Sequence, residues 1–315
     1  METLREIRRH IRSVRNISQI TRAMEMVAAS KMLRAQQQAL ASRAYAQKAW
    51  EVLTYLAGQP GGLAHPLYEV RPVKAIGIIL ITSDRGLCGP YNHNILRTTV
   101  QFMLGYMDKG IEIRLITVGR KGRDFMLRYG HNIVAEFTKV RDRPTIMEIA
   151  PIARIAMDEF ISGLVDEVYV AYTRFVSTIT QTPTIMKLLP IERPAPEERL
   201  AALYIFEPDP QTVLGEVLPR FTELQVYQAI LEAQASEHSA RMVAMRNATE
   251  NAQELINELT IRFNKVRQWN ITREMMDIAG GAEALRKARG IRVGIAGAFH
   301  FWGELGHNRW SPITS

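Results

Sequence analysis

The first 57 residues contain neither glycine nor proline, and this feature constrains the fold more than any other. These two residues are the ones that most strongly interrupt helices. Apolar residues recur here at spacings of three and four, as Leu4, Ile7, Ile11, Val14, Ile17, Ile20, Met24 and Val27. This spacing is typical of a coiled-coil seam. We therefore expect one helix of about 55 residues, roughly 80 Å long, which ends at the glycine-rich stretch 58–62.

A second long helical pattern follows residue 209. Between residue 209 and the Gly280-Gly281 pair, no glycine follows 215 and no proline follows 219, so we expect a helix of about 70 residues, roughly 100 Å long. One small core cannot bury two helices of this length. We expect them to pair in antiparallel orientation, because each would then cover the apolar stripe of the other.

One face of the second helix carries only small side chains. Residues at i and i+4 share a helix face, and this row consists of Ser236, Ala240, Ala244, Ala248 and Ala252. The second half of the first helix is also rich in Ala and Ser. We expect the two small-residue surfaces to meet in a closely packed seam.

The middle of the chain alternates between strand and helix patterns. We expect strands at 74–82, 111–119, 166–176 and 182–191, and helices at 92–108, 120–129 and 146–162. This alternation predicts a mostly parallel α/β sheet of the Rossmann-like kind. The predicted fold is therefore α/β plus a long antiparallel coiled coil. Its parts are an N-terminal shaft helix (1–57), an α/β globular domain (58–208), a C-terminal shaft helix (209–287) and an unassigned tail (288–315).

The excess positive charge is concentrated near the N-terminus. The chain has a net charge of +8, and residues 1–43 contain nine Lys or Arg residues against three acidic ones. Nucleic acid, an anionic membrane and an acidic protein surface would each suit such a helix. No apolar run is long enough to cross a bilayer, and the N-terminus lacks the pattern of a signal peptide.

The sequence contains no convincing catalytic group. The segment SDRGLCGPYN (83–92) follows a strand, but it lacks the glycine spacing of a phosphate-binding loop. We interpret it as a structural turn, and its Cys88 as a packed thiol rather than a nucleophile. The segment ASEHSAR would point its Ser, Glu and His in different directions on a helix. A single cysteine and scattered histidines argue against a metal site, and we expect no cofactor.

Several long motifs resemble one protein family. They include IRRHIRSVRNISQITRAMEMVAASKMLRAQ, SDRGLCGPYN, the YIFEPDP segment, SEHSARMVAMRNATENAQELI and FNKVRQWNITREMMDIAGGAEAL. In this order, from residue 1 to about 287, they are similar to the gamma subunits of ATP synthases. The resemblance implies a non-catalytic rotary shaft, which couples rotation of a membrane ring of c subunits to the conformational cycle of the catalytic beta subunits.

The resemblance also implies partners and a location. The partners would be the alpha and beta subunits (one copy per three alpha–beta pairs), the epsilon subunit and the c ring. The complex would lie at the cytoplasmic face of a bacterial inner membrane, to which this chain would be attached indirectly, through the c ring.

The family's contact residues carry over to this sequence at two ends. The resemblance assigns contacts with beta to Met24, Arg267, Gln268 and Thr272, and contacts with the c ring and epsilon to Tyr204, Phe206 and Glu207. Phe206 stands where the family has a Tyr, and Trp269 where a small Ala is familiar. With Cys88 alone, the chain lacks the regulatory cysteine pair of the chloroplast form.

The last residues, 288–315, have no counterpart in the family pattern. We expect them to be either a docking tail or a neutral extension. Among other functions, a basic coiled-coil protein that binds nucleic acid or a scaffold is the main alternative. A dinucleotide-binding enzyme is less favoured, because the glycine fingerprint is missing.

Overall fold

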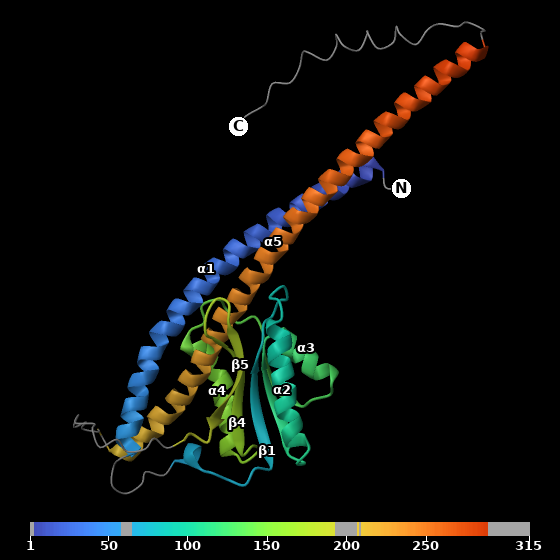
Figure 1. Ribbon diagram of the computed structural model, residues 1–315. Helices are drawn as coiled ribbons and strands as arrows, with labels where there is room; N and C mark the ends of the chain where they lie inside the picture. The colour runs from blue at the N-terminus through green and yellow to red at the C-terminus, as the bar shows by residue number, and fades with distance from the viewer. Residues whose placement is uncertain (1–2, 58–64, 193–206, 208, 289–315) are drawn as a thin grey trace. The chain divides into compact units, whose positions relative to one another are not determined.

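A computed structural model describes residues 3–57, 65–192, 207 and 209–288 (Figure 1). Two long helices, α1 (Leu4–Ala57) and α5 (Pro210–Ala288), contain 54 and 79 residues. Both predicted helices are thereby confirmed. The second continues through Gly280 and Gly281 and includes Pro219, so it is longer than the uninterrupted pattern suggested.

The start of α5 has a local explanation. Proline suits the first position of a helix because its missing N–H would have had no partner there. Asp209 precedes Pro210 and accepts hydrogen bonds from the backbone N–H of Thr212 at 2.9 Å and from its hydroxyl at 2.6 Å. This side chain therefore caps the helix.

Contacts divide the chain into two compact units. The larger comprises residues 16–253, and the smaller comprises residues 1–15 with the chain from 254 onward. In the larger unit the Thr21 and Thr249 hydroxyls lie 2.7 Å apart, and the Ser42 hydroxyl hydrogen-bonds the Gln228 side chain. From the first contact to the second, the sequence runs forward on α1, from Thr21 to Ser42, and backward on α5, from Thr249 to Gln228. The two helices are therefore antiparallel here.

In the smaller unit the guanidinium of Arg8 lies over the ring of Phe263, 5.3 Å from its centroid. Ile7, Ile256 and Leu259 are buried. Beyond Leu259, no described residue of α5 is fully buried.

The seam on α1 follows a seven-residue repeat. The side chains at its positions are buried or half-buried, and they are Ile7, Val14, Thr21, Ala28, Ala35 and Ser42. A repeat of seven keeps one face of a helix turned toward its partner. The residues change from large to small along α1, in agreement with the expected Ala- and Ser-rich second half.

The larger unit also contains a five-stranded sheet with the order β3-β2-β1-β4-β5. Its strands are β1 (Ala75–Ile81), β2 (Glu112–Val118), β3 (Ile133–Phe137), β4 (Glu167–Phe175) and β5 (Gln181–Leu189). The first four are parallel and β5 pairs with β4 in antiparallel orientation. The mostly parallel sheet is thus confirmed. The short edge strand β3 was not predicted.

Helices cover both faces of this sheet (Figure 1). The side chains of β1 alternate between two cores, as successive residues of a strand must. Ile76, Ile78 and Leu80 pack with α2 (Tyr91–Met107) and with Met126 of α3 (Arg120–Arg128). Ile79 and Ile81 pack on the other face with α4 (Ile146–Ile161), α5 and Leu53 of α1. The long helices are therefore part of the core of the α/β domain.

Candidate functional site

The loop after β1 folds back on itself through its own polar side chains. Ser83 accepts a hydrogen bond from Asn92 at 2.7 Å and donates one to the Arg85 carbonyl at 2.6 Å. The Ser83 backbone N–H donates to the Asn92 side chain at 3.0 Å. These bonds close the SDRGLCGPYN segment as a structural turn, which agrees with the interpretation from the sequence.

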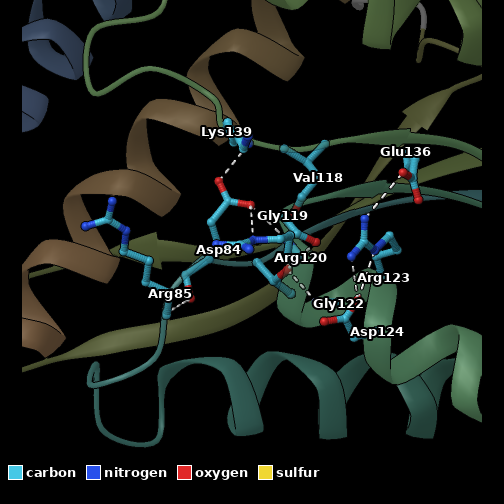
Figure 2. Close-up of polar contacts among 12 residues, drawn as sticks. Asp84, Arg85, Val118, Gly119, Arg120, Gly122, Arg123, Asp124, Glu136 and Lys139 are labelled. Carbon is cyan, nitrogen blue, oxygen red and sulfur yellow. Dashed lines mark hydrogen bonds and ion pairs between the residues drawn. The ribbon is translucent and has the colours of Figure 1, made fainter.

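The Asp84 carboxylate lies at the carboxyl edge of this sheet, within reach of the segments that follow β2 and β3 (Figure 2). Its carboxylate accepts hydrogen bonds from the backbone N–H of Arg120 at 3.0 Å and from that of Lys139 at 2.8 Å. Arg120 begins α3, and the N-terminus of a helix attracts anions. The Asp84 carboxylate therefore ties together the segments that follow β1, β2 and β3.

The α5 helix packs against the crevice in which related sheets bind dinucleotides. That crevice lies where the chain order reverses direction, between β1 and β4 in this sheet. Here Tyr91, which follows the β1 loop, donates its hydroxyl to the Ala233 carbonyl at 3.2 Å, and Ser236 donates to the Thr173 carbonyl of β4 at 3.0 Å. Ala240 packs with Cys88 and Tyr91. Part of the switch point is therefore covered by α5.

These contacts also correct the expected role of the small-residue row. Ser236, Ala240 and Ala244 face the α/β domain instead of α1: a Cβ built on Gly89 would lie 3.8 Å from that of Ala244. The predicted seam with α1 is therefore wrong for these three residues. Because a helix turns about 100° per residue, a four-residue spacing drifts by about 40° per step. A row of five such residues cannot keep one face.

Burial shifts the pKa values of several titratable groups near this crevice. Burial raises the pKa of the Cys88 thiol, which disfavours the reactive thiolate. Burial and the nearby Arg241 lower the pKa of His238 to about 4, so that the imidazole is neutral at pH 7. His238 and Arg241 contact each other through Nδ1 and Nη1 at 3.3 Å.

Met24 lines a groove of about 1020 Å³ in the larger unit. Part of α1 forms one wall, α5 forms another, and the loops after β1 and β3, with the start of α3, close the remaining side. The cationic residues that line it outnumber the acidic ones: Lys31, Arg85, Arg120, Lys139, Arg141 and Arg241 against Asp84, Asp142 and Glu237. Within the described part of the chain, the Arg85 and Lys139 side chains make no ion pair. This cationic groove, which surrounds Met24, was not predicted from the sequence.

The last described turns of α5 are almost fully exposed. Arg267, Gln268 and Thr272 all lie on the surface, as does Trp269, whose ring is 5.4 Å from the Arg273 guanidinium. Large apolar residues are exposed beside them: Ile271, Met275, Met276, Ile278 and Leu285. This segment offers a mixed apolar and basic surface.

The predicted contacts with the c ring and epsilon are only partly described. Glu207 is exposed, whereas Tyr204 and Phe206 lie outside the described residues, as does the tail from 289 onward. In the described part of the chain no group of His, Cys, Asp or Glu side chains could hold a metal ion. None of the described helices is long and apolar enough to cross a membrane.

Known proteins that match the chain share one description. The sequence model of the family described as "ATP synthase" matches residues 3–285. The chain is 53% identical over 287 residues to the ATP synthase gamma chain of Dehalococcoides mccartyi, covering 90% of this chain and 100% of the relative. The ATP synthase gamma chain of Roseiflexus castenholzii is 52% identical, with 90% and 99% covered.

Two solved structures share the fold. A chain of the Tetrahymena thermophila mitochondrial ATP synthase central stalk and c ring has a TM-score of 0.56 at 25% identity, covering 73% of this chain and 99% of its own. A chain of the Euglena gracilis mitochondrial ATP synthase has a TM-score of 0.64 at 19% identity, covering 93% of this chain and 97% of its own. The sequence matches establish that the chain belongs to the ATP synthase gamma chain family.

Proposed function

We propose that this chain is the central rotary shaft of a proton-translocating ATP synthase and is itself non-catalytic. The shaft couples rotation of the c ring to the conformational cycle of the catalytic beta subunits. Family membership over residues 3–285 carries the proposal. The geometry supports it, because α5 packs against the carboxyl ends of β1 and β4, where related sheets hold a nucleotide.

The exposed end of α5 has the chemistry of a surface that partners cover. Trp269 is 47% exposed and Met276 is 69% exposed, and apolar residues grouped on a surface mark interaction sites. We assign this segment to the interior of the alpha–beta hexamer. Arg267, Gln268 and Thr272 are its proposed contacts with a beta loop.

Single substitutions test those contacts. Arg267→Ala or Gln268→Ala removes hydrogen-bonding groups that are exposed in the free chain, and loss of one charge-assisted bond at an interface weakens association by about tenfold. We expect a corresponding loss in activation of alpha–beta ATPase by the purified chain. Arg246→Ala is the matched control, since Arg246 is an exposed arginine of α5 paired within the helix with Glu250. An equal effect of Arg246→Ala would contradict the assignment.

The cationic groove around Met24 is the proposed contact for an acidic loop of beta. Arg85 and Lys139 supply charges without ion-pair partners among the described residues. Contacts of this exposed kind are weak, so that they can exchange as the shaft turns. Arg85→Glu with Lys139→Glu should reduce activation of the head, most strongly at low salt. Activation that is unchanged at low salt would rule out this groove.

Tyr204, Phe206 and Glu207 are the proposed contacts with the c ring and epsilon. Of these three residues, Glu207 is described, and it is exposed. Glu207→Lys should weaken binding of epsilon and the c ring while the head still assembles. Loss of head assembly in this variant would contradict the assignment of Glu207 to the contact with the c ring and epsilon.

Because the c ring would attach the chain to the membrane, the chain would lie at the cytoplasmic face of the bacterial inner membrane.

Reconstitution tests the function as a whole. The purified chain is mixed with alpha and beta subunits, and the mass of the product and its ATPase rate are measured. We expect one copy per three alpha–beta pairs and a large gain in turnover. Absence of association, together with salt-sensitive binding to DNA, would instead favour the basic coiled-coil alternative.

A further inference from the structure

We propose that the carboxyl edge of the sheet is a torque-bearing joint, which holds residues 233–244 of α5 so that the helix and the α/β domain turn as one body. Tyr91, Ser236 and Ser239 are its positioning residues. This inference rests on the proposed shaft function. It identifies the contact through which torque is transmitted between the α/β domain and α5.

The centre of the joint is a set of buried hydroxyl groups. Ser236 and Ser239 are fully buried and Tyr91 is 4% exposed. Tyr91 donates to the Ala233 carbonyl at 3.2 Å, Ser236 to that of Thr173 at 3.0 Å, and Ser239 to that of Thr178 at 2.8 Å. Opening the joint without water access would leave these donors and carbonyls unpaired, which is costly in a protein interior. The bonds therefore resist separation.

Partly exposed bonds surround this centre. Gln234 donates to the Arg141 carbonyl at 2.8 Å, and Arg241 donates to the Gly86 carbonyl at 3.4 Å. Lys31 of α1 forms an ion pair of 2.8 Å with Asp142. The helix is thus bound by the loops after β1, β3 and β4. Contacts with three separate loops oppose both sliding of the helix along its axis and rotation about it.

The small residues of α5 permit this contact. Ala240 packs against Cys88 and Tyr91, and a Cβ built on Gly89 would lie 3.8 Å from the Cβ of Ala244. Larger side chains at 240 and 244 would push the loop after β1 away from the helix. The small side chains at 240 and 244 therefore allow α5 to pack closely against the loop after β1.

A reversible crosslink tests whether the joint stays closed. The expected Cβ separation of 3.8 Å between positions 89 and 244 suits a disulfide, so Gly89→Cys with Ala244→Cys is made in a Cys88→Ala background. The variant is assembled into the complete synthase in vesicles, and proton-driven ATP synthesis is compared before and after oxidation. The reduced form of the same protein is the control for the strain of a side chain at Gly89, where φ is +56°.

We expect synthesis by the oxidised complex to stay within about twofold of the reduced complex, a change of less than half a kcal/mol. A loss of more than about tenfold on oxidation, restored by reductant, would mean that the joint opens or slips during the cycle and would overturn the proposal.

A second variant tests whether the hydroxyl groups carry load. Tyr91→Phe with Ser236→Ala and Ser239→Ala removes three oxygens and little volume. We expect unchanged ATPase activity of the soluble head, a several-fold loss of proton-driven synthesis, and recovery of synthesis when the disulfide is added. Thr99→Val is the matched control, because it removes a buried hydroxyl that bonds within α2, to the Ile95 carbonyl at 2.8 Å.

Normal synthesis by the triple variant would overturn the positioning role, and so would an equal loss of ATPase activity and synthesis. Failure of the unmodified chain to activate the head would be a different result, because it would refute the shaft function itself.

Discussion

Asp84 should hold the edge of the sheet closed, and replacing it tests the geometry of the candidate site. In Asp84→Ala the backbone N–H groups of Arg120 and Lys139 lose an acceptor that lies 3.0 and 2.8 Å away. A hydrogen bond to a charged group contributes about 1.5–3 kcal/mol. The Asp84 side chain is 23% exposed, so we take the lower value for each bond. Their sum is about 3 kcal/mol, or roughly a hundredfold in a local opening equilibrium.

Hydrogen exchange of these two amides is the direct assay. We expect them to exchange about a hundredfold faster in Asp84→Ala, while amides in the middle of β1 keep their protection. Asp84→Asn keeps a neutral acceptor and should give a smaller increase. Asp124→Ala is the control, since Asp124 is 55% exposed and pairs with its neighbour Arg123, a kind of contact that contributes little. Unchanged exchange at both amides in Asp84→Ala would refute the role given to the carboxylate.

Three further predictions concern the same unit. Gly119→Ala would place a Cβ 2.2 Å from the Thr82 carbonyl oxygen. It should lower the free energy of unfolding, measured by urea titration, by more than about 3 kcal/mol. Gly110→Ala is the control, because Gly110 also has a positive φ but lies in open space, and it should lower the free energy of unfolding by only about 1 kcal/mol. The pKa of His238 falls from 6.5 to about 4 on folding. The free energy of unfolding should therefore be highest above pH 6.5 and should decrease by up to about 3 kcal/mol as the pH falls toward 4. His238→Gln should remove this pH dependence. Cys88 is 2% exposed and burial raises its pKa, so a thiol reagent should modify it slowly in the native chain and rapidly in urea, as followed by mass; rapid native labelling would contradict the packing.

The sequence predicts the main elements well where the pattern is long. The helices α1 and α5 and four of the five strands were expected, because continuous helical periodicity and buried apolar runs are strong local signals. β3 was missed because it is only five residues long, is nowhere fully buried and includes Glu136. A short, partly exposed edge strand lacks the apolar run by which the others were found.

Tertiary contacts were harder to predict. The row that begins at Ser236 was correctly located on one helix, but its partner was not, since Ser236 bonds to β4. Nothing local in the sequence shows that a serine hydroxyl will reach the carbonyl of a residue far away in the chain. The cationic groove was missed for the same reason: its charges come from α1, α3, α5 and two loops. The candidate contact residues came from family resemblance, which locates them without describing their surroundings.

Rotation of the chain inside an immobilised alpha–beta hexamer tests the shaft function most directly. A probe can be attached through Met147→Cys, because Met147 is 84% exposed on α4 while Cys88 is buried. On addition of ATP, the account predicts continuous rotation of the probe in one direction, with three pauses per turn that match the three catalytic beta sites. A probe that stays fixed while the same complexes hydrolyse ATP would contradict the assignment of this chain as the shaft.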